Sequence, residues 1–159
     1  MIRVGLGRDI HPLAAGRPFL LGGVELLADR GELGHSDGDV LAHAVIDAIL
    51  GASGQGDIGE LFPPTEAVWK DANSLKLLGK AVRLVKEAGW RFINLDCVII
   101  CECPKVLPYR ERIRASLAKV LGIPYEAVFV KGKTNEGLGA VGAGLAVEAL
   151  AVCLLENSA

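Results

Sequence analysis

The chain has only three histidines, and all of them lie beside carboxylates. His11 ends the run Asp9-Ile10-His11, while His35 and His43 begin and end His35-Ser36-Asp37-Gly38-Asp39-Val40-Leu41-Ala42-His43. Two imidazoles and a carboxylate give zinc three protein ligands and leave its fourth position open for water or substrate. An open position points to chemistry rather than to scaffolding. We therefore interpret Asp9, His11 and His43 as a candidate zinc site.

The predicted elements bring these three side chains together. If residues 1–11 form a strand, Asp9 and His11 project from the same face, because residues two apart share a side. His43 would reach the ion from a helix over residues 39–50, which is predicted by the spacing of Val40, Leu41, Ala44, Val45, Ala48 and Ile49. Asp37 or Asp39 would cap the start of this helix, and Gly51 would end it.

Two acidic residues on the same helix are candidates for supporting His43. Asp39 and Asp47 each lie four residues from His43, and either carboxylate could accept its second ring N–H. Such a bond fixes the tautomer and raises the basicity of the ligand. The alternative interpretation is that all these residues are surface and capping groups, since a lone Asp-x-His is a weak pattern. The full combination of residues favours the metal site.

Length and composition indicate one oligomeric domain. The 159 residues contain no low-complexity linker, so we expect a single domain over residues 1–159. Hydrophobic residues make up 51% of the chain but aromatic residues only 5%, so its apolar content is aliphatic. This is more than a monomer of this size buries easily, and a homo-oligomer would cover the excess.

Charge and apolar patterning disfavour two classes of partner. The formal net charge is −2, and no stripe of Lys and Arg with aromatic residues is present, so we expect neither nucleic acid nor membrane as a partner. Charged residues interrupt every apolar run, and no signal-like segment starts the chain, so a cytoplasmic protein is expected. No CxxC pair occurs, and we expect reduced, structural thiols at Cys97, Cys101, Cys103 and Cys153.

Strands and helices are predicted to alternate along the rest of the chain. We expect a strand at 18–27 interrupted by Gly22-Gly23, a polar turn at 28–34, an irregular binding or mobile loop at 51–70, a helix at 75–88 capped by Asn73 or Ser74 and closed by Gly89, a strand at 90–103, a helix at 108–121 ending at Gly122, and a strand at 127–131. Residues 145–156 fit a helix by propensity and a buried strand by alternation. The pattern indicates an α/β architecture with one sheet covered by helices.

Two glycine-rich or polar loops near the end of the chain have different weights. The run from Gly137 to Gly142 matches G-x-G-x-x-G, but too few residues follow it for the acidic residue that a dinucleotide site needs. The loop Lys133-Thr134-Asn135-Glu136 combines a cation, a hydroxyl and an amide with a carboxylate. It could hold phosphate oxygens together with a hard cation such as Mg²⁺, although by itself it could equally be a solvated turn. Two metals with phosphate donors describe phosphoryl transfer.

The chain closely resembles the 2-C-methyl-D-erythritol 2,4-cyclodiphosphate synthase family from end to end. The resemblance rests on Gly7-Arg8-Asp9-Ile10-His11, Gly22-Gly23-Val24, His35-Ser36-Asp37-Gly38-Asp39 through His43, Gly56-Asp57-Ile58-Gly59 with Phe62-Pro63, Pro104-Lys105 with Leu107-Pro108, and Lys131 through Glu136. It implies an α/β (α+β) fold with a single mixed sheet, helices packed on one face, and a homotrimer with the sheets around its three-fold axis. It also makes residues 145–156 a strand.

The resemblance implies a reaction and a set of site residues. The family cyclises 4-diphosphocytidyl-2-C-methyl-D-erythritol 2-phosphate to 2-C-methyl-D-erythritol 2,4-cyclodiphosphate, with release of CMP, at sites between subunits. Asp9, His11 and His43 would bind Zn²⁺, Glu136 would bind Mg²⁺ or Mn²⁺, and His35 and Thr134 would stabilise the transition state. The implied substrate contacts are Asp9, His11, His35, Ser36, Asp57, Ile58, Gly59, Phe62, Glu66, Cys101, Glu102, Cys103, Pro104, Lys105, Val106, Leu107, Lys133, Thr134, Asn135 and Glu136.

This chemistry needs no general base, since the attacking phosphate oxygen is already largely ionised near neutral pH. Two rival functions remain. A metal-dependent phosphodiesterase would use zinc-bound hydroxide on a similar substrate, and a metal-stabilised oligomer would have no activity. Product analysis separates the first two, because cyclisation yields CMP and a cyclic diphosphate without incorporating water.

Overall fold

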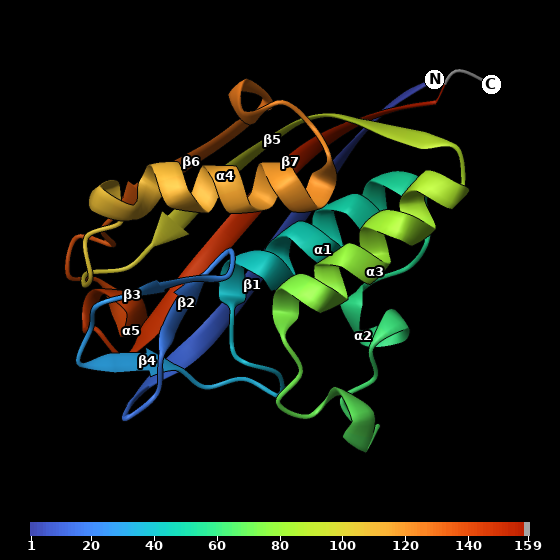
Figure 1. The fold of residues 1–159 in the computed structure, drawn as a ribbon. Coiled ribbons are helices and arrows are strands. Elements are labelled where there is room, and N and C mark those ends of the chain that lie inside the picture. The colour runs from blue at the N-terminus through green and yellow to red at the C-terminus, as the bar shows by residue number, and fades with distance from the viewer. Residues whose placement is uncertain (158–159) are drawn as a thin grey trace.

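A five-stranded mixed sheet forms the centre of the computed structural model, which describes residues 1–157 (Figure 1). The last two residues of the predicted 1–159 domain lie outside the described residues. The strand order is β4 (Arg30–Glu32), β1 (Ile2–Ala15), β7 (Ala146–Asn157), β5 (Trp90–Ile100) and β6 (Val128–Lys133). Only the β5–β6 pair is parallel, and the other neighbours are antiparallel. The predicted fold class is confirmed.

Three long helices cover one face of this sheet: α1 (Val40–Ser53), α3 (Ser74–Glu87) and α4 (Arg110–Leu121) (Figure 1). The segment at 145–156, which propensity left open, is the strand β7, as the resemblance implied. Its residues toward the helices are buried, and they are Val147, Ala149, Ala151, Cys153 and Leu155. A central strand with one face under helices needs this alternation, so burial outweighs helix propensity here.

Two glycines let α1 lie directly on β1. A Cβ atom added to Gly5 would come within 1.9 Å of the Ala48 carbonyl oxygen, and one added to Gly7 within 1.9 Å of the Ala44 carbonyl oxygen. Contacts this short are impossible, so the close approach of strand and helix requires glycine at both positions. The same strand face continues toward Asp9 and His11, and α1 brings His43 toward them.

The helix ends follow the predicted caps with one exception. Asp39 caps α1, Asn73 caps α3, and α4 ends at Gly122 in the left-handed conformation. The predicted end of α1 at Gly51 is wrong, because the helix continues to Ser53 and its C-cap is Gly54, with φ 73°. Gly51 is exposed and has no neighbour that would force a break, so an interior glycine costs the helix only a modest free energy.

Short elements fill the segments that sequence patterns described only as turns or loops. The predicted strand at 18–27 is a hairpin of β2 (Phe19–Leu21) and β3 (Val24–Leu26), and both turn glycines have positive φ. The polar turn at 28–34 contains β4, which the prediction missed. The loop at 51–70 contains α2 (Ile58–Leu61) and η1 (Ala67–Trp69). The other short helices are η2 (Leu107–Tyr109), η3 (Tyr125–Ala127) and α5 (Gly139–Gly142).

The face of β1 away from the helices is apolar and open to water. Ile2, Val4 and Leu6 are each about two-thirds exposed, at 66%, 66% and 65%. Arg8 follows them on the same face and pairs with Glu148 of β7 at 2.5 Å. Such a continuous aliphatic face is typical of a surface covered by another protein chain. Within residues 1–157, no helix is both long and apolar enough to cross a membrane.

Candidate metal and substrate site

Asp9, His11 and His43 converge on one point, as the sequence predicts. Asp9 Oδ2 lies 2.9 Å from His11 Nε2 and 3.1 Å from His43 Nδ1, and the two ring nitrogens are 3.3 Å apart. In a tetrahedral zinc site with bonds of about 2.0 Å, donor atoms are about 3.3 Å apart. The three atoms therefore have nearly the spacing of zinc ligands.

Hydrogen bonds on the far side of each ring determine which nitrogen is free. His11 Nδ1 lies 2.6 Å from the Gly38 carbonyl oxygen, which can only accept, so Nδ1 carries the proton and Nε2 presents a lone pair. His43 Nε2 lies 2.8 Å from Ser36 Oγ and 3.0 Å from Ser74 Oγ. With the Nε2 proton donated to these hydroxyls, His43 Nδ1 also presents a lone pair toward Asp9.

Three acceptors that face one another need a cation between them. Burial by itself raises the pKa of the Asp9 carboxyl, but its contacts with His11 and His43 outweigh burial and hold the pKa well below its usual range. Burial lowers the pKa of His11, and the contact with Asp9 reverses this and raises it. Both shifts express a demand for positive charge at this point, and a divalent cation with three ligands meets it.

The prediction that Asp39 or Asp47 accepts the second N–H of His43 is wrong. The Asp39 carboxylate is turned to the start of its own helix and accepts from the backbone N–H groups of Ala42, Gly22 and Gly23. Asp47 accepts from the Ile58 N–H at 2.9 Å, at the start of α2. Both carboxylates satisfy helix N-termini, which leaves the hydroxyls of Ser36 and Ser74 as partners of His43.

A cavity of about 350 Å³ opens beside the three ligands. It gathers several residues that the sequence assigned to the site, namely Asp9, His11, His35, Ser36, His43, Ile58, Gly59 and Phe62. His35 is exposed on its loop, as predicted, whereas the Ser36 hydroxyl is buried against His43. Asp57 caps α2, and Glu66 accepts from the Trp69 indole N–H at 3.1 Å.

The loop from Lys133 to Glu136 belongs to a second region. Thr134 Oγ1 donates to Glu136 Oε1 at 2.8 Å, and Glu136 has the unusual φ of 53° for a residue with a side chain. The carboxylate of Glu102 supports this turn, because its Oε1 accepts from the N–H groups of Asn135 at 2.9 Å and Gly137 at 3.5 Å. Glu102 thus contacts the loop through its side chain, in addition to its predicted place in the 101–107 segment.

A cavity of about 220 Å³ adjoins this loop and is lined by Cys101, Pro104, Lys105, Val106, Leu107, Arg110, Gly132, Lys133 and Thr134. Most of these residues were assigned to the nucleotide, and the exception that carries charge is Arg110. Its guanidinium lies 5.4 Å from the centre of the Phe129 ring, and within residues 1–157 its buried Nε has no hydrogen-bond partner. Lys105, Arg110 and Lys133 make the cavity suitable for an anionic ligand.

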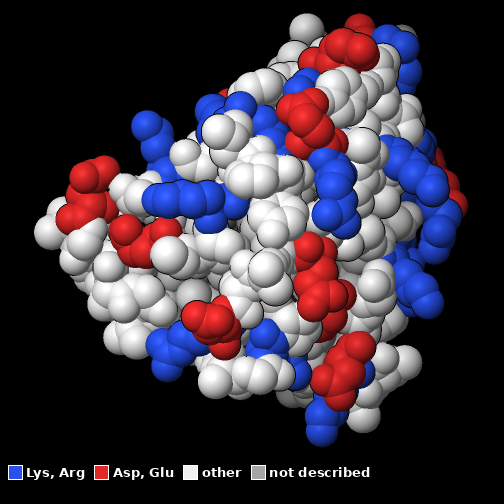
Figure 2. All heavy atoms as spheres, turned by 60° about the vertical axis from the view of Figure 1, so that its left-hand side comes forward, with Lys and Arg blue, Asp and Glu red and all other residues white. Residues whose placement is uncertain are grey.

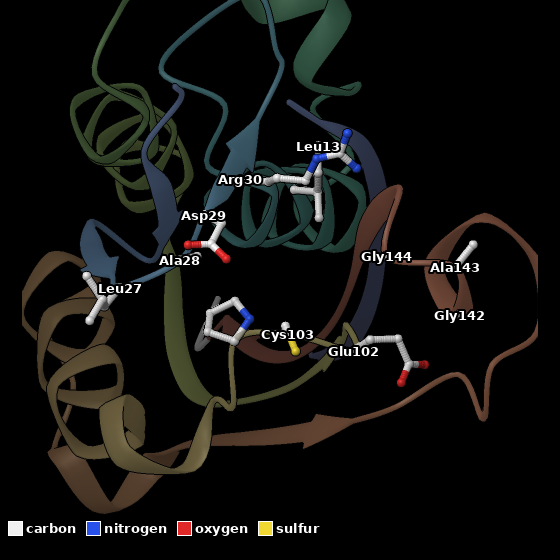
Figure 3. Close-up of a pocket in the computed structure, with 11 residues that line it drawn as sticks. Leu13, Leu27, Ala28, Asp29, Arg30, Glu102, Cys103, Gly142, Ala143 and Gly144 are labelled. Atoms are coloured by element: carbon white, nitrogen blue, oxygen red, sulfur yellow. The ribbon is translucent and has the colours of Figure 1, made fainter. Parts of the chain in front are cut away.

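The largest cavity, about 750 Å³, lies between these regions and the hairpin (Figure 3). Leu13, residues 27–30, residues 102–104 and residues 142–144 line it. Glu102 and Cys103, both predicted substrate contacts, border this space. The three metal-ligand side chains are absent from its lining, so size by itself does not identify the reactive part of the molecule.

The two groups of predicted site residues occupy different parts of one chain. The cavities beside His43 and beside Thr134 share no lining residue. In Figure 1, α2 lies at the lower right of the molecule and α5, which follows the Thr134 loop, at the lower left. On the face shown in Figure 2, acidic and basic side chains are interspersed with uncharged surface rather than gathered by sign. The structure therefore assembles the metal ligands but not the whole predicted site.

Sequence patterns missed three residues near the site. Ser74 was considered only as a helix cap, Asp37 only as a cap of α1, and Arg110 had no assigned role. Ser74 is fully buried, and its N–H donates to Asp37 Oδ2 at 3.0 Å, which connects the start of α3 to the histidine loop. No local pattern marks such a contact, because the two residues are 37 positions apart.

Known proteins similar to this chain share a single description. The chain is 54% identical over 154 residues to the 2-C-methyl-D-erythritol 2,4-cyclodiphosphate synthase of Treponema denticola, covering 97% of this chain and 96% of that protein. A solved structure of a synthase of this name in its CDP-bound form matches with a TM-score of 0.89 at 40% identity, covering 97% of this chain and 100% of that chain. The bifunctional IspDF of Campylobacter jejuni matches with a TM-score of 0.95 at 39% identity.

That alignment covers 99% of this chain but only 42% of the bifunctional protein. The family model of the YgbB family matches residues 2–156. The match therefore extends over nearly the whole sequence and includes both the metal ligands and the Thr134 loop. With a relative more than half identical over its full length, the chain belongs to the YgbB family.

Proposed function

We infer that this chain is a 2-C-methyl-D-erythritol 2,4-cyclodiphosphate synthase of isoprenoid precursor synthesis. It converts 4-diphosphocytidyl-2-C-methyl-D-erythritol 2-phosphate to the cyclic diphosphate and CMP. The observation that carries this inference is the convergence of Asp9, His11 and His43 in a chain whose relatives bear this name. The whole chain, residues 1–159, is proposed to be one domain, and the cytoplasm is its proposed location.

The metal ligands fit zinc best. The donor set contains two imidazole nitrogens and one carboxylate oxygen, and both second ring nitrogens have partners that orient the rings. Glu136 is the proposed protein ligand of the second cation, Mg²⁺ or Mn²⁺, since carboxylate oxygen suits these hard ions. When bound, the two cations would offset charge on the diphosphate and stabilise the leaving phosphate.

We propose that the complete site forms between subunits of a homotrimer. One chain supports this by holding the His43 cavity and the Thr134 cavity apart, so that each would meet the other half on a neighbouring copy. The exposed aliphatic face formed by Ile2, Val4, Leu6 and Ile10 supports it independently, because a trimer with the sheets around its axis would bury this face.

Binding and orientation are the tasks left to the protein. In the reaction, an oxygen of the 2-phosphate forms a bond to the β-phosphorus, and the bond from that phosphorus to the bridging oxygen breaks, so the electron pair leaves with CMP. The segment 57–66 would hold the methylerythritol, and residues 101–107 with Lys133 would hold the cytidine. His35 and Thr134 would donate hydrogen bonds to phosphate oxygens as charge develops on them.

One assay tests the activity against its rival. The purified protein with Zn²⁺ and Mn²⁺ should release CMP from the cytidylated substrate and form the cyclic diphosphate in equal amounts. In water enriched with ¹⁸O, neither product should contain the label. A labelled, uncyclised product would instead identify a phosphodiesterase, and absence of turnover would favour a structural metal site.

A variant tests the ligand assignment. We expect His43→Ala to lose stoichiometric zinc, because two remaining ligands cannot hold the ion tightly. His35→Ala is the matched control, since His35 lies beside the same cavity but outside the ligand set, and it should keep its zinc. Metal analysis after gel filtration measures both, and stoichiometric zinc in His43→Ala would contradict the assignment.

A further inference from the structure

A chain of hydrogen bonds connects His43 to a carboxylate that does not touch it. Ser36 Oγ lies 2.8 Å from His43 Nε2 and 3.0 Å from Ser74 Oγ, and Ser74 Oγ also lies 3.0 Å from His43 Nε2. The Ser74 hydroxyl in turn makes a very short contact with Asp37 Oδ1. Ser36 is 4% exposed and Ser74 0%, so water does not compete for these bonds.

The protons in this chain can be arranged in one direction only. The Asp37 carboxylate accepts and cannot donate, so the single proton of the Ser74 hydroxyl belongs to that contact. Ser74 can then only accept from its other neighbours, and Ser36 donates its own proton to Ser74. Both hydroxyl oxygens are therefore acceptors toward His43, and Nε2 must carry the ring proton.

We propose that Asp37, acting through Ser74 and Ser36, is the positioning residue that holds His43 with a proton on Nε2 and a lone pair on Nδ1. This inference rests on the proposed metal centre, because the lone pair on Nδ1 is the one that faces Asp9 at 3.1 Å. The carboxylate thus acts on the ligand through hydroxyls, where a direct carboxylate–histidine contact is the more familiar arrangement.

The backbone holds both ends of this connection in place. Asp37 Oδ2 accepts from the Ser74 N–H at 3.0 Å, the Asp37 N–H donates to the Ala72 carbonyl at 3.0 Å, and the Asp71 N–H donates to the His35 carbonyl at 3.0 Å. The histidine loop and the start of α3 are therefore bonded at three points. Ser74 cannot move away from Asp37 without breaking them, so the direction of the relay is built into the fold.

An isosteric substitution reverses the direction. In Asp37→Asn the amide oxygen should stay at the Oδ2 position, where it accepts the Ser74 N–H at 3.0 Å, since the other position loses only the longer 3.3 Å contact from the Asp39 N–H. The amide NH₂ then donates to Ser74 Oγ, and the Ser74 proton turns toward Ser36 and His43. His43 Nε2 becomes an acceptor, and the ring proton moves to Nδ1, where it blocks the metal.

Two measurements detect this reversal. Selective ¹⁵N-histidine labelling of the metal-free protein gives signals from only three residues, so the His43 tautomer can be assigned from its ring nitrogen shifts. We expect a proton on Nε2 in the unsubstituted chain and on Nδ1 in Asp37→Asn. Competition with a chelator should show a dissociation constant for Zn²⁺ that is about 10–100-fold larger in Asp37→Asn.

A double substitution separates the relay from a general loss of structure. Ser74→Ala removes the hydroxyl through which Asp37 acts, so Asp37→Asn added to Ser74→Ala should change zinc affinity by less than about twofold. Effects that multiply would mean that Asp37 acts independently of Ser74, and this would overturn the proposal. An unchanged tautomer with unchanged affinity in Asp37→Asn would do the same. If the unsubstituted chain binds no zinc, the metal centre itself is wrong.

Discussion

Glu32 offers the sharpest test of how buried charge affects the stability of this fold. Its side chain is 0% exposed at the end of β4, where Oε2 accepts from the Leu20 N–H at 2.9 Å and Oε1 from the Val40 N–H at 3.3 Å. Burial, followed by the nearby Asp39 carboxylate, raises the pKa of Glu32 to about 9. The folded protein therefore keeps a proton at neutral pH that the unfolded chain releases above its pKa of 4.5.

The sign of the pH dependence follows from this difference. Between pH 4.5 and about 9 the folded state binds more protons at Glu32 than the unfolded state does, so stability falls as pH rises. At pH 7 the cost is about 3 kcal/mol, since each pH unit above the unfolded pKa contributes about 1.4 kcal/mol. Glu32→Gln carries no titrating group and avoids this cost.

The substitution should therefore stabilise the protein in a pH-dependent way. Glutamine keeps a carbonyl oxygen for the Leu20 N–H but loses the weaker bond from Val40, at a cost of about 1 kcal/mol. We expect a net gain of about 2 kcal/mol at pH 7, which disappears below about pH 5.5. Urea unfolding from pH 5 to pH 8, at fixed protomer and zinc concentrations, measures it.

The matched control is Glu25→Gln, which removes an exposed carboxylate from the neighbouring hairpin. It should leave the slope of unfolding free energy against pH unchanged. If Glu32→Gln and the unsubstituted chain gave parallel curves across this range, Glu32 would be ionised in the folded state. The burial argument would then be refuted, whatever the absolute stabilities.

Three further outcomes are expected. Glu136→Gln should lower CMP release at least ~100-fold while zinc content stays stoichiometric, and turnover restored by ordinary Mn²⁺ concentrations would exclude Glu136 as its ligand. Glu102→Ala should reduce turnover about tenfold and Glu102→Gln should largely retain it, because one carbonyl oxygen can replace the single Oε1 that accepts both loop N–H groups. Leu6→Asp, on the exposed face of β1, should convert trimers to monomers in sedimentation, and an intact trimer would contradict the proposed interface.

Periodicity was sufficient to predict the metal ligands because their geometry is local. Asp9 and His11 share a strand face by alternation, and the helical spacing from Val40 onward placed His43 on a helix. The same reasoning failed for the partner of His43, because four-residue spacing brings Asp39 and Asp47 near it without saying what else competes for them. Helix N-termini took both carboxylates, and Ser74, which is 31 residues away from His43, took their place.

Glu32 shows a second limit of pattern reasoning. A short polar segment, Arg30-Gly31-Glu32, predicts a turn, yet it forms β4 because Leu13, Ala14 and Ala15 of β1 provide an edge to pair with. Pairing with β1 places the Glu32 carboxyl in the core beside the start of α1. Tertiary contact thus decides both the strand and the burial of its acid, and neither leaves a signature in the local sequence.

The position of the metal site follows from packing that begins two turns of helix away. Gly5 and Gly7 bring the β1 backbone against the carbonyls of Ala48 and Ala44, closer than any other residue type would allow. His43 immediately precedes Ala44, and Asp9 is the next residue after Gly7 on the same strand face. Each element therefore places its ligand one step beyond its closest contact. The two glycines make the strand and helix meet at a distance that three zinc ligands can span, so the alternation G-x-G-x-D-x-H encodes the approach and the ligands together.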